Sequence, residues 1–428
     1  MTTQQLPATP TAAPALAAAL TCRACGAPLS EVFVDLGMSP LSNSYLRAED
    51  LPRAETFYPL CTFVCGRCFL VQLPEAATPE QIFGDYAYFS SFSDTWLRHA
   101  ETYVEAMVGR FGLGAAHQVV ELASNDGYLL QYFQRRGVPV LGVEPARNVA
   151  AAAQEKGIPT VVRFFGTAAA RDLVAEGRRA DLVVANNVLA HTPALNDFVA
   201  GMKLVLAPRG VVTLEFPHVL RLVDENQFDT IYHEHFSYFS FTTVRRVFAA
   251  HGLELFDVEE LPTHGGSLRI YARHVGGGTG EVVSGRVADL LGREAAWGVE
   301  RLDTYRTFAE RVRQTKFRLL EFLIAEQRAG RTVAGYGAPA KGNTLLNFCG
   351  VRSDLLAYTV DRSPHKQGLF LPGTRIPILG PDHIRATRPD VVLILPWNLR
   401  QEVMEQMADV RSWGGRFVVA IPELTVYP

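Results

Sequence analysis

The chain has 428 residues, of which 48% are apolar and 20% are charged, and its formal net charge is −3. This length is more than one hydrophobic core usually serves and favours about three domains of an ordinary globular protein. The small net charge gives no electrostatic reason to expect a nucleic-acid or membrane partner, and no run of about 18 apolar residues predicts a membrane span.

Residues 1–20 are rich in Ala, Pro and Thr and lack the basic start of a signal peptide. They are predicted to be a disordered tail on a cytoplasmic protein. Five of the six cysteines lie near the N-terminus. In a chain with no export signal, this clustering favours metal thiolates over disulfides.

The first module is predicted over residues 21–79 and contains two C-x2-C pairs. Each pair, with its glycine, can present two thiolates to one tetrahedral Zn²⁺. Cys61 is a rival fourth ligand. Four thiolates leave no open coordination position, so the zinc is expected to be structural. The predicted ligands are Cys22, Cys25, Cys65 and Cys68.

An aromatic stretch, residues 83–92, links this module to the next. Most of its rings are expected to pack between modules, while one phenol, Tyr86 or Tyr88, faces a cleft. A helix is predicted to follow over about residues 93–110.

The second module, residues 80–278, alternates strand and helix. Strands are predicted at 118–123, 138–143, 180–185 and 210–216, and a helix at 128–136. This order predicts a mostly parallel, Rossmann-like sheet that binds ligands at the carboxyl ends of its strands.

The turn after the first of these strands reads Ala-Ser-Asn-Asp-Gly and lacks G-x-G-x-x-G. That disfavours a dinucleotide and favours a nucleoside without phosphates, such as S-adenosylmethionine (SAM). Glu144 ends the next strand, 17 residues after Gly127, where it can bind ribose hydroxyls. The predicted cofactor-binding residues are Glu121, Ser124, Asn125, Asp126, Gly127, Glu144, Asn186 and Asn187.

Residues 229–238 bring together two histidines, a glutamate and two tyrosines. A positioned histidine can remove a proton, and a phenol beside it can stabilise the resulting anion. An extended chain would separate Tyr232 and Glu234 from His233 and His235, whereas a helix or turn could bring all four together. Core packing and metal binding are alternatives, although the spacing is not the H-E-x-x-H of zinc proteases.

The last module, residues 279–428, begins with a long helical region of one or two helices. A second, smaller doubly wound α/β domain follows, with strands at 332–336, 391–395 and 416–421. Its first turn contains G-x-G-x-x-A, which by motif alone permits an NAD fold. A helix N-terminus beside Lys341 is also a natural phosphate site, and a purely structural turn is the alternative.

These motifs, in this order, resemble the zinc-containing, SAM-dependent sugar C-methyltransferases that act on nucleotide-linked 4-keto-deoxysugars. The resemblance covers about Cys22 to Pro428 and implies zinc, SAM-binding and C-terminal α/β domains, of which the outer two help to hold the sugar nucleotide. The expected partner is therefore a small-molecule nucleotide sugar, and a monomer or weak homo-oligomer is expected. The predicted substrate-binding residues are Tyr336, Lys341, Asn343, His264 and Arg269.

The resemblance implies that His235 is the general base, that Tyr232 and Glu234 share its site, and that Tyr86 and His191 are further catalytic residues. His235 would remove the proton beside the C-4 ketone of a dTDP-linked sugar, and the enolate would take the methyl group of SAM. Methylation at C-3 is expected and C-5 is the alternative, in deoxysugar and antibiotic biosynthesis. The rival functions are an NAD-dependent oxidoreductase and a non-catalytic zinc-ribbon adaptor.

Overall fold

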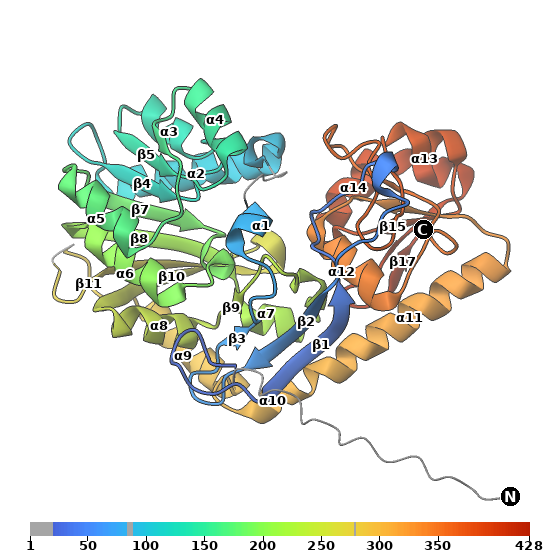
Figure 1. Ribbon diagram of the computed structural model, residues 1–428, viewed down its shortest axis with the longest axis horizontal. Helices are drawn as coiled ribbons and strands as arrows, with labels where there is room; N and C mark the ends of the chain where they lie inside the picture. The colour runs from blue at the N-terminus through green and yellow to red at the C-terminus, as the bar shows by residue number, and fades with distance from the viewer. Residues whose placement is uncertain (1–19, 84–88, 278–279) are drawn as a thin grey trace, which may run out of the picture.

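The computed structural model describes residues 20–83, 89–277 and 280–428. Within these ranges the strands form three sheets, of four, seven and six strands. Figure 1 shows the seven-stranded sheet in one lobe, the six-stranded sheet in the other, and the four-stranded sheet between them. The predicted fold class is confirmed: an N-terminal module, a central Rossmann-like domain and a smaller C-terminal α/β domain.

The N-terminal sheet is antiparallel and includes one strand from the central module. Its strands, in spatial order, are β1 (Glu31–Ser39), β2 (Tyr58–Val64), β3 (Val71–Gln72) and β9 (Ser237–Tyr238). The short helices η1 (Ala48–Asp50) and α1 (Pro79–Phe83) also belong to this part of the chain. Since β9 begins two residues after His235, its pairing with β3 fixes one end of the histidine-rich segment.

The central sheet is parallel over most of its width. Its order is β10 (Leu253–Leu261), β11 (Ser267–His274), β8 (Leu206–Pro217), β7 (Ala180–Asn186), β4 (Val119–Leu122), β5 (Val140–Val143) and β6 (Thr160–Val161). Among the described strands of this sheet, only β11 runs antiparallel to its neighbours, β10 on one side and β8 on the other. All four residues of β4 and of β5 are buried, as is expected for strands covered by helices on both faces.

Helices flank the central sheet and carry residues to its carboxyl edge. They are η2 (Ser90–Phe92), α2 (Asp94–Phe111), α3 (Leu130–Arg135), α4 (Arg147–Glu155), α5 (Thr167–Ala175), η3 (Leu189–His191), α6 (Leu195–Val205), α7 (Val219–Asp224), η4 (Phe228–Thr230), α8 (Phe241–Ala250) and η5 (Thr263–Gly265). The predicted helices at 93–110 and 128–136 correspond to α2 and α3.

Three helices follow the central sheet, where one or two were expected. They are α9 (Gly285–Trp297), α10 (Leu302–Arg306) and α11 (Phe308–Arg328). α9 packs against α8 and β10 of the central sheet. The long α11 runs beneath the C-terminal lobe (Figure 1) and contacts β1, where Phe308 stacks on Phe33 with ring centroids 4.6 Å apart.

The C-terminal sheet is parallel except for its last strand. Its order is β14 (Ile378–Leu379), β13 (Thr359–Val360), β12 (Val333–Tyr336), β15 (Val391–Ile394), β16 (Arg416–Val419) and β17 (Thr425–Tyr427). The accompanying helices are α12 (Ala340–Cys349), α13 (Asp382–Thr387), η6 (Trp397–Leu399), α14 (Arg400–Gln406) and η7 (Ala408–Trp413). The predicted strands 332–336, 391–395 and 416–421 correspond to β12, β15 and β16.

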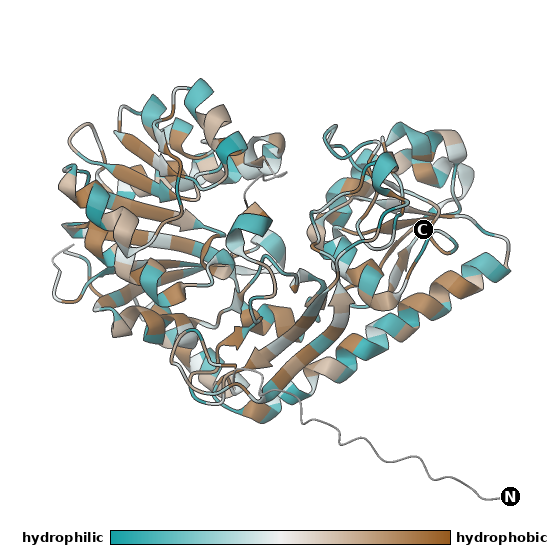
Figure 2. Ribbon diagram, viewed as in Figure 1, coloured by the Kyte–Doolittle hydropathy of each residue, from teal (hydrophilic) through white to brown (hydrophobic). Residues whose placement is uncertain are grey.

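In Figure 2 the strands of both lobes are mainly apolar, while many of the surrounding helices carry polar stretches. Burial of these strands between helices accounts for the two lobes, because apolar area removed from water is the main driving force of folding. Among the helices of the described ranges, none combines the length and hydropathy needed to cross a bilayer.

Candidate active site

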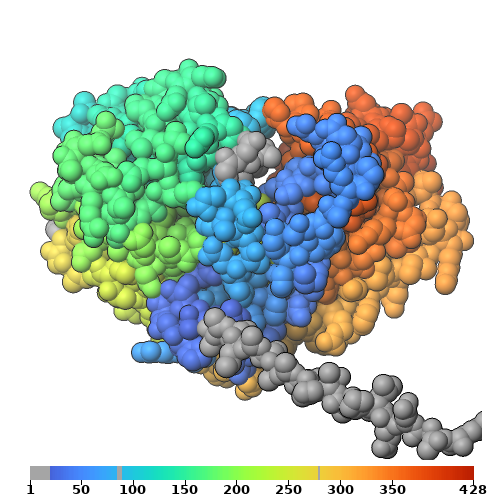
Figure 3. All heavy atoms as spheres, in the orientation of Figure 1, coloured from blue at the N-terminus to red at the C-terminus, as the bar shows by residue number. Residues whose placement is uncertain are grey.

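A cleft of about 690 Å³ lies between the two lobes, and all three modules contribute to its walls. Asn43 comes from the N-terminal module, and Lys341 and Lys366 come from the C-terminal domain. The central domain supplies most of the remainder, including the carboxyl ends of β5 and β7. Figure 3 shows the surface hollowed between the central lobe (green) and the C-terminal lobe (orange).

The histidine-rich segment reaches the cleft through a turn. The backbone N–H of His235 donates to the carbonyl of Tyr232 at 2.9 Å, and Tyr232, Glu234 and His235 all line the cleft. His233 does not line it, because its Nε2 lies 3.2 Å from the carbonyl oxygen of Pro59 on β2. The turn therefore separates His235 from His233. An extended chain would have kept the two histidines on one side, and a fully convergent turn would have brought His233 into the cleft as well.

The His235 imidazole is held in one tautomer. Its Nδ1 lies 2.8 Å from the carbonyl oxygen of Thr230. Because a carbonyl can only accept, Nδ1 carries the proton, and the neutral ring keeps its lone pair on Nε2. Burial, aided by the charge of Lys341, lowers the pKa of His235 to about 4 despite the bond to Thr230. The ring is therefore in its base form near neutral pH.

Two further imidazoles and a phenol surround this ring. The ring centroids of Tyr232 and His191 lie 4.1 and 4.7 Å from that of His235. Burial is the main cause that lowers the pKa of His191, and it lowers the pKa of His264 to about 4. His264 has a positive φ of 55° and faces Asn187, with Nε2 and Nδ2 3.4 Å apart. All three histidines are thus uncharged near neutral pH.

An asparagine of the N-terminal module holds the cleft glutamate. The Nδ2 of Asn43 donates to Oε1 of Glu234 at 2.5 Å, and the hydroxyl of Tyr45 donates to Oδ1 of Asn43 at 3.3 Å. Glu234 is buried, so this charge-assisted bond offsets part of its desolvation. Asn43 lies in an ordinary loop sequence that gave no signal of this role.

The strand ends of the central sheet form the second part of the cleft. Glu144 accepts the backbone N–H groups of Asn125 at 2.9 Å and of Ala146 at 2.8 Å, and it lines the cleft beside Asn186. Positive φ angles occur at Ala123, Asn125 and Asn187, all at carboxyl ends of strands. Such costly backbone conformations cluster at ligand sites, which agrees with the predicted location.

The chemistry of these strand ends fits SAM. Oε2 of Glu121, Oδ1 of Asp126 and Oδ1 of Asn186 are buried and have no hydrogen-bond partner among the described residues. Burial, and then the charges of Glu144 and Asp126, raise the pKa of Glu121 well above its usual range. Of these three residues Asn186 lines the cleft, so a ligand with hydroxyl or amine donors can pair its oxygen. The acidic groups beneath the cleft wall favour a ligand that carries positive charge, as SAM does.

Several predicted cofactor residues lie beneath the cleft wall. Glu121, Ser124, Asp126 and Gly127 are not among the residues that line the cleft. Asp126 instead accepts from Lys156 at 2.9 Å. Gly127 has φ +76°, and a Cβ there would approach Cγ1 of Ile158 to 2.9 Å, so the turn needs glycine.

The C-terminal turn places one of its three predicted substrate residues in the cleft. Lys341, in the first turn of α12, lines the cleft and donates to Oδ1 of Asn398 at 2.8 Å. The hydroxyl of Tyr336 instead donates to Oε1 of Gln406 at 3.0 Å, and Nδ2 of Asn343 donates to the carbonyl of Ser42 at 2.7 Å. Both side chains are used for packing between elements and lie off the cleft wall.

Arg269 also differs from the prediction. Its Nε donates to Oε1 of Glu215 at 2.8 Å and its Nη1 donates to Oε2 of Glu259 at 2.9 Å, all within the sheet formed by β8, β10 and β11. The guanidinium is buried and does not line the cleft. Lys366, which the sequence did not single out, lines the cleft in its place. Tyr86 and its alternative Tyr88 fall outside the described residues.

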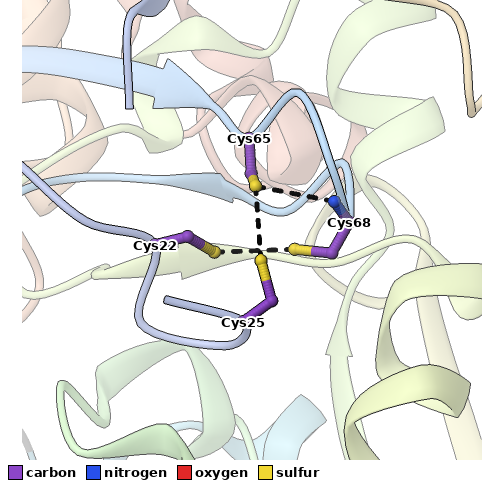
Figure 4. A group of neighbouring side chains, drawn as sticks. All are labelled: Cys22, Cys25, Cys65 and Cys68. Atoms are coloured by element: carbon purple, nitrogen blue, oxygen red, sulfur yellow. Dashed lines mark hydrogen bonds between the residues drawn. The ribbon is translucent and has the colours of Figure 1, made fainter. Parts of the chain in front are cut away.

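The four predicted zinc ligands lie together (Figure 4). Their sulfur atoms are all within 4.8 Å of one another, with Cys22 and Cys68 3.5 Å apart and Cys25 and Cys65 3.6 Å apart. Sulfurs about 2.3 Å from a tetrahedral Zn²⁺ lie about 3.8 Å from each other, so the cluster fits this ion.

The surroundings of the cluster support thiolate ligands. Nε2 of Gln72 donates to Sγ of Cys22 at 3.1 Å, and the backbone N–H of Arg67 donates to Sγ of Cys65 at 3.4 Å. Cys61 lies outside the cluster on β2, opposite Asp35. Burial and the charge of Asp35 raise the pKa of Cys61 to about 11, which favours a protonated thiol. The structure therefore supports the two C-x2-C pairs as the ligand set.

A Rossmann-like sheet with an acceptor-rich edge, joined to a four-cysteine site, defines a SAM-dependent methyltransferase with a structural zinc domain. Family models match along the chain in the same order: a zinc-binding domain over residues 22–83, a methyltransferase domain over 96–258 and a C-methyltransferase C-terminal domain over 262–422.

One curated relative is the C-methyltransferase NovU of Streptomyces niveus. It is 37% identical over 405 residues, which cover 94% of this chain and 95% of the relative. The chain therefore belongs to the family of zinc-containing, SAM-dependent C-methyltransferases. This membership supports the methyltransferase interpretation against the oxidoreductase and adaptor alternatives.

Solved methyltransferases also resemble part of the chain. Magnesium protoporphyrin IX methyltransferase of Synechocystis, solved with bound S-adenosylhomocysteine (SAH), is 16% identical, has a TM-score of 0.34, and the match covers 45% of this chain and 91% of that one. A SAM-dependent methyltransferase of Anabaena variabilis is 13% identical with a TM-score of 0.35, over 41% of this chain and 85% of that one. Scores this low say nothing about substrate.

The zinc ligand set can be tested with a matched pair of cysteine variants. Cys65→Ser removes a cluster ligand and is expected to lower both the zinc content and the unfolding temperature, because the metal stabilises only the folded chain. Cys61→Ser should keep about one zinc per chain. Elemental analysis and thermal unfolding measure both effects. A full zinc content in Cys65→Ser would contradict this ligand set.

The strand-end site can be tested by calorimetric titration with SAH. Glu144→Gln removes a charged acceptor from the cleft and should weaken SAH binding by about ten- to a hundredfold, the usual loss for a hydrogen bond to a charged group. Glu155→Gln, at the exposed end of the adjacent helix α4, should bind SAH as the parent does. Equal affinity in both variants would remove Glu144 from the cofactor site.

Proposed function

We propose that the protein transfers the methyl group of SAM to a carbon beside the C-4 ketone of a dTDP-linked 4-keto-deoxysugar, as a step of deoxysugar biosynthesis for antibiotics. C-3 is the proposed carbon and C-5 is the alternative. One observation carries the proposal: His235, whose Nδ1 is bonded to the Thr230 carbonyl, lines a cleft whose walls also carry the acceptor-rich strand ends and two lysines.

The proton beside a ketone is acidic because the carbanion left behind delocalises onto the carbonyl oxygen. In the proposed reaction Nε2 of His235 takes this proton and the electron pair moves onto the ketone oxygen. The Thr230 carbonyl, already 2.8 Å from Nδ1, stabilises the imidazolium that forms. The same hydrogen bond therefore both selects the basic nitrogen and lowers the free energy of the protonated ring.

The enolate oxygen needs a donor, and two side chains near His235 can supply one. The Tyr232 ring is the closer, and a phenol donates well to a developing oxyanion. His191, whose ring lies against that of His235, is the second candidate. Glu234, held by Asn43, is placed to orient a sugar hydroxyl or an imidazole.

Bound SAM supplies an electrophilic methyl group on a positively charged sulfur. The strand-end residues Glu144 and Asn186 would hold this cofactor in the cleft. The three cleft histidines assist by being neutral, since burial lowers their pKa values. Uncharged rings do not repel the sulfonium, whereas imidazolium rings would.

The C-terminal wall provides the positive charge that a nucleotide diphosphate needs. Lys341 lies at the N-terminus of α12, and Lys366, whose Nζ donates to the carbonyl of Ala338 at 2.9 Å, also lines the cleft. A helix N-terminus and ammonium groups together favour phosphate. We therefore assign the nucleotide to this wall and the sugar ring to the space beside His235, in a protein that acts as a monomer or weak homo-oligomer.

The role of the base can be measured without methyl transfer. In D₂O with SAH bound, the parent protein should exchange the hydrogen beside the ketone of a dTDP-4-keto-deoxysugar, and His235→Asn should slow this exchange by on the order of 10²- to 10⁴-fold. His233→Asn is the matched control, because its ring contacts Pro59 outside the cleft. NMR follows the exchange and identifies the methylated carbon when SAM replaces SAH. Parental exchange in His235→Asn would remove the base role.

The pH dependence of kcat has a defined sign. Only the unprotonated ring can act as base, and burial lowers the pKa of His235 from 6.5 to about 4. The value of kcat should therefore stay level as the pH falls from neutral and decrease only on approach to that lower pKa. Because the unfolded chain protonates its histidines first, stability also declines below the unfolded pKa. Half-loss of kcat near pH 6.5, in protein shown to be folded, would contradict this expectation.

A further inference from the structure

Two side chains of the C-terminal domain hold the residues on either side of Thr230. Nε1–H of Trp397 donates to Oδ2 of Asp229 at 2.8 Å, and the hydroxyl of Thr344 donates to the carbonyl oxygen of Ile231 at 3.1 Å. The Thr230 carbonyl between them is the group that bonds Nδ1 of His235. The C-terminal domain thus contacts the residue before and the residue after Thr230, whose carbonyl orients His235.

These contacts lie in a buried interface. Trp397 is 4% exposed, Thr344 is 1% exposed and Asp229 is fully buried. The Thr344 hydroxyl also lies 3.5 Å from the carbonyl of Ala340, so the bond to Ile231 is the shorter of the two. Water cannot replace a lost hydrogen bond in such a place, so each bond constrains the backbone more than a surface bond would.

The Trp397 indole also contacts Lys341. Nζ of Lys341 lies over its ring, 4.6 Å from the centroid, while its N–H reaches Asp229. Burial raises the pKa of Asp229 to about 6, and Lys341 and Trp397 oppose this rise, so the carboxylate is charged near neutral pH. The indole is therefore fixed between a cation and an anion, and its orientation is closely defined.

Resting on the proposed role of His235, we propose that Trp397 and Thr344 are positioning residues for the base. They set the place of the Thr230 carbonyl and, through it, the direction in which His235 presents Nε2 to the cleft. The C-terminal domain then does more than bind the nucleotide. Its contacts with residues 229–231 orient His235 for proton removal. The rate of proton removal therefore depends on how the C-terminal domain packs against these residues.

Thr344 offers a matched pair of variants. Thr344→Val keeps the shape but removes the hydroxyl, and Thr344→Ser keeps the hydroxyl. Hydrogen–deuterium exchange at the sugar carbon and kcat are measured with the dTDP-4-keto-deoxysugar that the parent methylates fastest. Displacement of a catalytic group by about 1 Å can cost on the order of 10²-fold, so a partial shift in Thr344→Val should slow both about tenfold. Thr344→Ser should remain within about twofold of the parent.

Trp397→Phe tests the same proposal independently, because it removes the indole N–H and leaves a ring beneath Lys341. It should slow exchange and kcat as Thr344→Val does, while SAH affinity and KM for SAM stay at the parental values; the unfolding temperature should fall, because Asp229 loses a buried hydrogen bond. A split of this kind, with kcat reduced and binding kept, is the mark of a displaced base rather than of a weakened fold. Should Thr344→Val not fold, Trp397→Phe decides the matter.

Three outcomes are distinguishable. Exchange that requires His235 but is parental in both Thr344→Val and Trp397→Phe would overturn the positioning role and leave the proposed function standing. SAH affinity that falls in step with the exchange rate would also overturn it, in favour of general structural support. Exchange that persists in His235→Asn would overturn the proposed function itself.

Discussion

The hydrogen bond from Nδ1 of His235 to the Thr230 carbonyl is the interaction on which the proposed active site depends. It places the lone pair of a neutral imidazole on Nε2, toward the cleft, and it remains in place when the ring takes a proton. Burial alone would make the ring neutral but would leave either nitrogen free to face the substrate. The turn from Tyr232 to His235 makes the bond possible, because it folds the side chain back toward the preceding η4.

This short segment is held from all sides by parts of the chain that are far away in sequence. β9 joins it to the zinc-bearing sheet, Asn43 holds Glu234, and Thr344 holds the carbonyl of Ile231. A loop with this many polar groups would be costly to bury without such partners. The three-module architecture thus provides the donors and acceptors that allow a rigid polar turn to exist inside the protein.

Local sequence was sufficient for features whose cause is local. The two C-x2-C pairs gave the zinc cluster, and alternation of strand and helix gave the central and C-terminal sheets with their ligand-binding edges.

Arg269 and Tyr336 were misplaced because their partners, Glu215 and Gln406, come from other strands and helices, and no spacing rule reveals such a pairing. Asn43 and Lys366 escaped notice for the same reason: only the folded chain brings them to the cleft. The turn geometry that separates His233 from His235 also depends on contacts with β2 and was left open by the sequence.

The pairing of β3 with β9 has a consequence for how the protein is made. When the N-terminal strands leave the ribosome, β9, the partner of β3, has not yet been synthesised. The edge of β3 therefore stays unpaired until residues 237–238 have been made. An unpaired edge can recruit foreign strands, so metal capture by the cysteines is of value early, while the sheet is still incomplete. Exchange of this N-terminal segment between related enzymes would likewise have to preserve a strand that is encoded more than a hundred codons downstream.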